Sequence, residues 1–348
     1  EGKSGGMGSK LMAVVAEGDR NRVYLSPTKD MEDIANSASP AWKPKSSLPM
    51  NPRDFKTPNY GLETFADLFT SRQLVALNTF SDLVQEAREK VIADAKNKGW
   101  VDDEIGLENG GLSATAYGDT VSIYLACGVN QLTRYLCTIC AWNNTNQNVA
   151  QAFGRQAIPM VWDYAEANPI HGPLSIVKTV GWSSSSIKNI SNTYKGNAFL
   201  QDATNINLNI NPIISTDPPY YDNMGYAELS DFFYIWIRRT LGEILNDLCL
   251  TLFSPKSEEI VATPYRHGTK DKAEKFFFDR MNKAMECFSS QTTSVYPLTI
   301  YYAFKQSETQ GDKGTASTGW ETFLNAVITS GLIICGTWPI RTERDKGL

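Results

Sequence analysis

Four consecutive residues have the clearest chemical potential in the chain: Asp217, Pro218, Pro219 and Tyr220, at the end of the apolar run NPIIST. A residue before proline is driven out of the helical region, and each proline fixes its own φ and lacks an N–H. The tetrapeptide therefore presents a carboxylate and outward carbonyl oxygens in a stiff arrangement with few donors. Such acceptors suit an amino group that donates two hydrogens, and the Tyr220 ring adds a flat surface that suits a nucleobase.

The chemistry that fits these residues is reaction at an exocyclic amine of adenine or cytosine. This amine is a poor nucleophile, because its lone pair is delocalised into the ring. Hydrogen bonds to Asp217 and to the Pro218 carbonyl would draw the nitrogen toward a tetrahedral shape and free the lone pair to attack a methyl group in line. A base in a duplex must leave the stack to reach such a pocket, where Tyr220 would hold it. The alternative is a tight proline-rich turn; the position at the end of a buried strand favours the functional interpretation.

The elements that must position this motif follow from the pattern after about residue 196. Strands are predicted at NAFLQDA, INPIISTDPPY, YPLTIYYAF and LIICGTWPI, and helices at YAELSDFFYIWIRRTL, AEKFFFDRMNKAMECF and TGWETFLNAVITSG. Strands that alternate with helices predict a mostly parallel sheet covered by helices, which is an α/β fold. Ligands in such sheets bind at the carboxyl ends of strands, and Asp217 lies at one of them.

The preceding residues divide into two further predicted regions. Residues 1–60 form the N-terminal region, with a hairpin over residues 10–26. A proline-rich linker or strap follows over residues 39–61. Residues 61–150 form a helical region, in which helices over 71–98 and roughly 117–142 would pair through apolar faces. Cys137 and Cys140 share a face of the second helix, which indicates core packing. No metal site is predicted.

Composition limits the class of protein. The 348 residues allow two or three domains, and 42% hydrophobic with 20% charged residues is typical of a soluble globular chain. A net charge of −5 argues against a general nucleic-acid binder but leaves room for a local basic face. Six cysteines form no disulfide framework and suggest a reducing compartment, so we expect a cytoplasmic protein with no membrane span.

The segment TDPPYYDNMGYAELSDFFYIWIRR resembles the catalytic motif region of amino-methyltransferases that act on DNA. More closely, it resembles the adenine-specific DNA methylases whose longer members carry a zinc ribbon. The resemblance extends to LMAVVAEGDRNRVYL, FGRQAIPMVWDYAEANP, VATPYRHG, YYAFKQSE and TASTGWETFL, and thus to most of the chain. It implies a Rossmann-like fold, S-adenosylmethionine as methyl donor, and DNA as partner. The family's motif falls on Asp217 to Tyr220, and aspartate in first place fits adenine N6 better than cytosine N4.

The resemblance also bears on the cofactor site. Asp202 is similar to the acid that, in this superfamily, ends the preceding strand and contacts the cofactor's adenine; a strand-end turn residue is the equal alternative. The superfamily's glycine-rich loop is absent, since the only G-x-G lies at residues 6–8 and follows no strand. The chain therefore corresponds to the second half of an incomplete methyltransferase sheet, residues 151–348, with residues 61–150 as a helical insertion. A missing N-terminal portion or a partner subunit would complete the site, and we expect the chain alone to bind the cofactor weakly or not at all.

A basic segment follows the motif. PYRHGTKDKAEK, residues 264–275, is predicted as a loop whose cations would contact phosphates near the flipped base: Arg266, His267, Lys270 and Lys272. A solvated loop is the alternative, because two acidic residues dilute the charge. Two other functions also stay open, namely a non-catalytic DNA-binding subunit of a restriction or defence system and an amino-methyltransferase acting on RNA.

Overall fold

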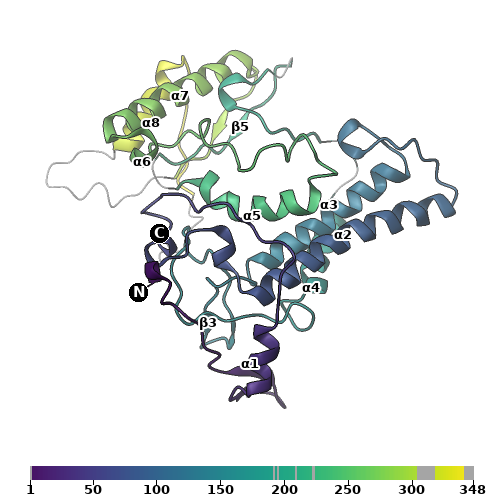
Figure 1. Ribbon diagram of the computed structural model, residues 1–348. Coiled ribbons are helices and arrows are strands. Elements are labelled where there is room, and N and C mark those ends of the chain that lie inside the picture. Colours follow the sequence, from purple (N-terminus) through teal and green to yellow (C-terminus); the bar gives the residue numbers. More distant parts are fainter. Residues whose placement is uncertain are drawn as a thin grey trace. The chain divides into compact units, whose positions relative to one another are not determined.

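The computed structural model describes residues 2–190, 193, 196–207, 210–221, 224–303 and 318–340, and its chain divides into two compact units. Unit 1 comprises Glu1–Asn192 and Glu228–Ser254, and unit 2 comprises Thr193–Ala227 and Pro255–Leu348. Figure 1 shows the elements of both. The fold is mixed α and β, with helices predominating and with small two-stranded sheets among the described residues.

Unit 1 opens with short elements and is dominated by helices. The 3₁₀ helix η1 spans Gly2–Ser4, and strands β1 (Val14–Glu17) and β2 (Arg22–Leu25) form the predicted hairpin, in which Val14 pairs with Leu25. Helix α1 (Lys29–Asn36) and the 3₁₀ helices η2 (Thr57–Tyr60), η3 (Phe65–Leu68) and η4 (Leu107–Asn109) are short. The longer helices are α2 (Ser71–Asn97), α3 (Ala114–Thr133) and α4 (Ile176–Lys188), and β3 (Trp142–Asn143) pairs with β4 (Asn148–Val149).

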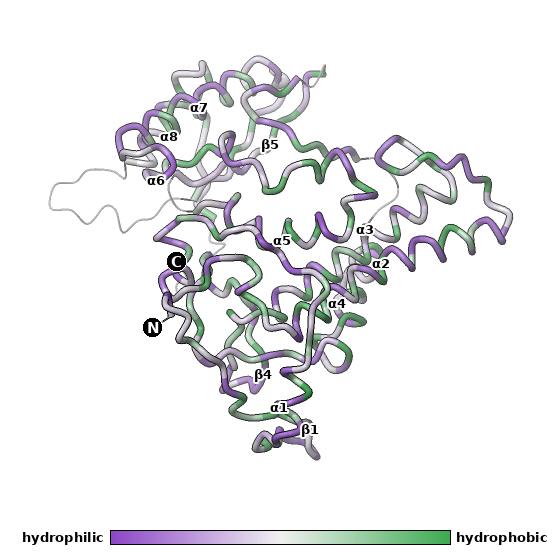
Figure 2. Tube along the Cα trace, viewed as in Figure 1, coloured by the Kyte–Doolittle hydropathy of each residue, from purple (hydrophilic) through white to green (hydrophobic). Residues whose placement is uncertain are grey.

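The prediction of a helix over 71–98 is confirmed by α2. Thr70 accepts a hydrogen bond from the Gln73 N–H, and the Gln73 side chain accepts one from the Thr70 N–H, which together form a capping box. Figure 2 shows hydrophilic and hydrophobic residues interleaved along α2, the pattern of a helix with one buried face. Helix α3 begins earlier and ends earlier than the predicted range 117–142, because the chain turns after Thr133 and places Cys137 and Cys140 outside the helix.

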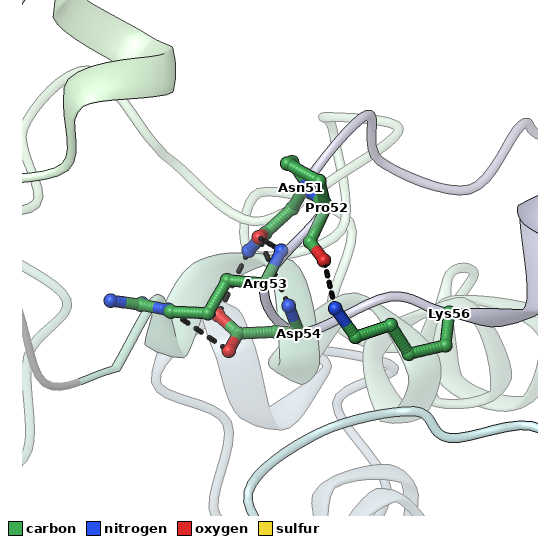
Figure 3. Close-up of polar contacts among 5 residues, drawn as sticks. All are labelled: Asn51, Pro52, Arg53, Asp54 and Lys56. Atoms are coloured by element: carbon green, nitrogen blue, oxygen red, sulfur yellow. Dashed lines mark hydrogen bonds and ion pairs between the residues drawn. The ribbon is translucent and has the colours of Figure 1, made fainter.

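The proline-rich segment over 39–61 is a strap fixed to the body of unit 1. The Trp42 carbonyl accepts a hydrogen bond from Asn78 Nδ2 of α2 at 2.8 Å. At the other end of the strap, Asn51 and Asp54 are almost fully buried, and Asn51 Oδ1 accepts from the backbone N–H groups of Arg53 and Asp54. Arg53 Nε lies 3.0 Å from Asp54 Oδ1 (Figure 3). These contacts satisfy the buried polar groups and hold the strap in one conformation.

Most of helix α5 (Tyr226–Leu241) also belongs to unit 1, which differs from the predicted division at residues 60 and 150. The prediction grouped this helix with the catalytic half. Its buried side chains pack in unit 1 instead: the Phe232 ring stacks on Phe69 at 5.5 Å between centroids, and the Trp236 ring meets Phe69 edge-on at 5.4 Å. Aromatic burial of this size determines which unit a helix joins.

Unit 2 contains the remaining elements. These are the 3₁₀ helix η5 (Ala203–Asn205), strands β5 (Ser215–Thr216) and β6 (Thr299–Ile300), and helices α6 (Pro264–His267), α7 (Lys270–Gln291) and α8 (Thr318–Thr329). Helices α7 and α8 lie side by side (Figure 1) and supply most of a buried core that includes Phe277, Met281 and Phe323. The helices predicted in this half are thus confirmed.

The predicted parallel sheet is confirmed only as a single parallel pair, β5 with β6. The predicted strands at residues 197–203 and 332–340 are wrong, because these residues, all described, form no strand. A strand requires a neighbour with which to exchange hydrogen bonds, and apolar residues in these runs remain open to solvent: Phe199 is 81% exposed and Ile333 is 85% exposed. A Rossmann-like sheet is therefore not present among the described residues.

Helices long and apolar enough to cross a membrane are absent from the described part of the chain.

Candidate active site

The motif Asp217 to Tyr220 lies directly after strand β5, as the sequence predicts. The Ile214 carbonyl accepts a hydrogen bond from the Thr299 N–H at 3.0 Å, and the Thr216 carbonyl accepts one from the Tyr301 N–H at 2.8 Å. This parallel pairing fixes the backbone up to the residue before Asp217. The motif therefore occupies the carboxyl end of a parallel strand, where ligands bind in α/β proteins.

The motif presents its carboxylate to solvent. Asp217 is exposed and Pro218 is buried, while Pro219 and Tyr220 are half-buried. No described cation forms an ion pair with Asp217, and its Oδ1 accepts a hydrogen bond of 2.9 Å from the Tyr220 hydroxyl. The carboxylate and the aromatic ring therefore lie together, with Oδ2 open to a further donor.

The backbone after the motif makes a sharp turn. Tyr221 has a φ of 43°, in the left-handed region, and its N–H donates to the Pro219 carbonyl at 3.2 Å. The Ala262 N–H in turn donates to the Tyr221 carbonyl at 3.0 Å. The Pro218 carbonyl, the second acceptor expected to receive an amine hydrogen, accepts from no described residue, and Pro218 itself is buried.

Tyr221 anchors this turn in the core of unit 2. Its ring meets Phe277 of α7 edge-on, with 5.1 Å between ring centroids. On another side it lies against Gly319 of α8, where an added Cβ would come within 2.9 Å of the Tyr221 Cγ. Only a residue without a side chain permits this close approach. The neighbouring Tyr220 is therefore placed by a fixed backbone.

A group of aromatic rings lies beside Tyr220. The Tyr220 ring meets Tyr302 edge-on, with centroids 5.6 Å apart, and Tyr302 stacks on Phe323 of α8 at 4.1 Å. Trp320 lies 5.7 Å from Tyr302. Tyr302 was not predicted as a site residue. Its signal in the sequence is its position just after β6, because the ends of adjacent parallel strands share one edge of a sheet.

Asp202 makes structural contacts through both carboxylate oxygens. Its Oδ1 accepts hydrogen bonds of 2.9 Å from the backbone N–H and the hydroxyl of Thr204, and its Oδ2 lies 2.6 Å from Arg280 Nη2. Partial desolvation acts to raise the pKa of Asp202, but the hydrogen bonds from Thr204 and Arg280 outweigh it and lower the pKa. These contacts match the turn-residue alternative for Asp202.

The predicted basic loop at residues 264–275 is wrong as to its structure, because these residues form α6 and the start of α7. Arg266 pairs with Glu259 at 2.6 Å, and both side chains are about nine-tenths buried. The His267 ring stacks on Phe276 at 4.2 Å, and desolvation lowers the pKa of His267. These two residues thus serve packing within unit 2. Lys270 and Lys272 remain exposed, with Lys270 3.6 Å from Glu274.

The Cys137 and Cys140 thiols are buried in the turn after α3, with their sulfur atoms 3.3 Å apart. The prediction of a core position is confirmed, although these residues do not share a helix face. Across the described ranges, His, Cys, Asp and Glu side chains do not gather in groups of three or more that could hold a metal ion.

Comparison of the chain with protein-family models, with curated proteins and with solved structures gave no match.

Proposed function

We propose that the chain is the catalytic portion of a DNA adenine N6-methyltransferase that acts on a base flipped out of the duplex. The observation that carries the proposal is the arrangement of Asp217, the Pro218 carbonyl and the Tyr220 ring at the carboxyl end of β5. It combines an exposed carboxylate, a carbonyl that accepts no hydrogen bond from the described residues, and a flat ring on a backbone that sheet pairing and Tyr221 hold in place.

Each residue has a defined part in this proposal. Asp217 Oδ2 and the Pro218 carbonyl accept the two hydrogens of the adenine amine and localise its lone pair on nitrogen. The Tyr220 ring stacks on the base, and the rings around Tyr302 support Tyr220 from its edge. Catalysis then rests on orientation and on electrostatic stabilisation of the charge that develops on the amine nitrogen.

The methyl donor in this proposal is S-adenosylmethionine, which supplies an electrophilic methyl group. Asp202, the residue expected to contact its adenine, is engaged by Thr204 and Arg280, which supports a donor site that includes residues from elsewhere. We therefore place the remainder of that site on a glycine-rich loop supplied by a further portion of the protein or by a partner subunit. In the cell the proposed partner is DNA, and the proposed location is the cytoplasm.

The test is methyl transfer from labelled S-adenosylmethionine to DNA by the full-length protein, together with any partner subunit, in wild-type and variant forms. Asp217→Ala should reduce transfer by about 10²–10³-fold, the effect of removing one transition-state hydrogen-bonding group. Asp279→Ala is the matched control, since Asp279 is another exposed aspartate of unit 2, on α7. Equal transfer by the two variants would contradict the role given to Asp217.

A non-catalytic DNA-binding subunit is the second candidate, and the contacts of Asp202 favour it. Such a protein would bind DNA through the same base pocket and would transfer no methyl group, with or without a partner. An RNA substrate distinguishes the remaining alternative, because an RNA methyltransferase would modify an adenine-containing RNA faster than the matching DNA.

A further inference from the structure

A large groove in unit 1 lies between the strap, the start of α2 and the last turns of α5. Its volume is about 1020 Å³, the upper end of the range of roughly 300–1,000 Å³ that is typical of small-molecule sites. The strap contributes the consecutive residues 39–46, and α5 contributes Ile235, Arg238 and Arg239. The groove is therefore long along the strap, and two distant parts of the sequence form its walls.

The strap holds two exposed lysines of the groove lining on a fixed backbone. The Pro44 carbonyl accepts from the Ala66 N–H at 3.1 Å, and the Ser46 carbonyl accepts from the Phe65 N–H at 3.0 Å. The intervening residues alternate with these: Lys43 and Lys45 are exposed, while Pro44 is buried. Because Lys43 precedes a proline, its backbone is held extended. Two ammonium groups thus project from a rigid segment at a spacing of two residues.

The arginines on the opposite wall are held in place by groups of unit 1. Arg239 Nη2 lies 2.5 Å from Asp82 Oδ1, and its guanidinium lies over the Trp42 ring at 5.5 Å from the centroid. Arg238 Nε donates to the Cys249 carbonyl at 3.2 Å. Each guanidinium has five N–H donors, so these contacts leave donors for a further acceptor. Both arginines are oriented before any ligand arrives.

The groove has a positive charge balance in an acidic chain. Four cationic residues line it, namely Lys43, Lys45, Arg238 and Arg239, against Asp67 in the lining and Asp82, which pairs with Arg239. Asp67 already accepts hydrogen bonds from the N–H groups of Glu63 and Thr64. The net charge of the whole chain is −5, so this groove departs from the average surface and attracts anions.

We propose that this groove binds the phosphate backbone of a nucleic-acid strand. The choice of DNA as that nucleic acid rests on the proposed function. Cations distributed along an extended segment match a row of phosphates better than one isolated anion. Trp42 is half-buried between Arg239 and Trp236, so the ring that the strap contributes to the groove is already packed against protein groups. The contacts are therefore independent of base sequence and serve to position the strand.

The experiment measures binding of fluorescently labelled duplex and single-stranded oligonucleotides to the full chain by anisotropy, over a series of salt concentrations and without methyl donor. The variant K43Q/K45Q removes two phosphate contacts. It should weaken binding at least about tenfold at low salt and should lower the slope of log affinity against log salt by about two. The effect should be the same for oligonucleotides of unrelated sequence.

The matched control is K98Q/K188Q, which makes the same change in net charge. Lys98 and Lys188 are exposed lysines of unit 1 that do not line the groove. Equal losses in the two double variants, an unchanged salt slope in K43Q/K45Q, or no binding by the wild type would overturn the inference. So would displacement of the oligonucleotide by poly-glutamate or inorganic phosphate at equal charge concentration, because the groove would then be a general anion site.

Failure of the groove proposal and failure of the proposed function give different results. Groove-dependent DNA binding without methyl transfer by the complete enzyme would support the groove and contradict the methyltransferase. Methyl transfer by the complete enzyme, with a DNA affinity that K43Q/K45Q leaves unchanged, would support the methyltransferase and contradict the groove.

Discussion

The Tyr220 hydroxyl donates a hydrogen bond of 2.9 Å to Oδ1 of Asp217. The bond brings the ring proposed to stack on a base and the carboxylate proposed to accept its amine to the same side of the motif. It also means that one oxygen of Asp217 is occupied when no base is bound. An incoming amine then either uses Oδ2 or competes with the hydroxyl for Oδ1.

Mutations can separate the contribution of the Tyr220 hydroxyl from that of its ring. Tyr220→Phe removes the hydroxyl and keeps the ring, so transfer and affinity for a base in the pocket should stay within about threefold of wild type. Tyr220→Ala removes the stacking surface and should weaken binding by about 1–3 kcal/mol. Binding of DNA with a fluorescent adenine analogue at the target position measures both. Tyr301→Ala is the control, since that exposed tyrosine follows β6 without contacting Asp217 through any described bond; equal losses for Phe and Ala at position 220 would contradict stacking.

The helices of this chain were predictable because their signals are local. The three- and four-residue spacing of apolar side chains and the Thr70 cap define α2 within its own sequence. The strands were less predictable, because a strand forms only where a neighbouring segment exchanges backbone hydrogen bonds with it. The runs that contain Phe199 and Ile333 have the apolar composition of buried strands, yet no described segment pairs with them. The sequence of a segment alone does not show whether another segment will pair with it.

The site shows the same division between local and distant causes. The place of Asp217 after β5 follows from the motif and the apolar run before it. The pairing of Arg266 with Glu259 and the stacking of His267 on Phe276 depend on how α6 and α7 fold back on the chain. Four basic residues within seven positions therefore predicted a phosphate-binding loop. In the folded chain, Arg266 and His267 make contacts within unit 2 instead.

Gly319 offers a test of how firmly the turn after the motif is held. Alanine is favoured over glycine in a helix by about 1 kcal/mol, but a Cβ at this position would come 2.9 Å from the Tyr221 ring. Gly319→Ala should therefore destabilise the protein by about 1–3 kcal/mol in urea unfolding. Gly181→Ala in α4 is the matched control, because its Cβ would meet no atom within 4 Å and should stabilise by about 0.5–1 kcal/mol. A Gly319→Ala variant as stable as Gly181→Ala would show that Tyr221 is loosely packed.

Asp202 predicts a specific dependence of stability on pH. Its pKa is lower in the folded chain than in the unfolded chain, where an aspartate titrates near 3.9. Its contribution is therefore complete well above that value and is lost as the pH falls through the folded pKa. Asp202→Asn should be less stable than wild type by about 1 kcal/mol at pH 7, and the two should converge in acid. Asp279→Asn controls for the loss of charge; parallel stability curves for Asp202→Asn and wild type between pH 7 and pH 3 would contradict the ion pair with Arg280.

The buried thiols predict which cysteines react in the native protein. Burial raises the pKa of Cys137, so little of it is the reactive thiolate at neutral pH, and solvent reagents have no access to either thiol of the pair. Cys335 is exposed and serves as the internal comparison. We expect a thiol-exchange reagent to modify Cys335 within seconds to minutes at pH 8, and to modify Cys137 and Cys140 only after denaturant is added. Mass spectrometry of peptides locates the modified residues. Rapid native labelling of Cys137 while the buried Cys249 of the same unit stays unmodified would show that the turn after α3 opens locally to solvent.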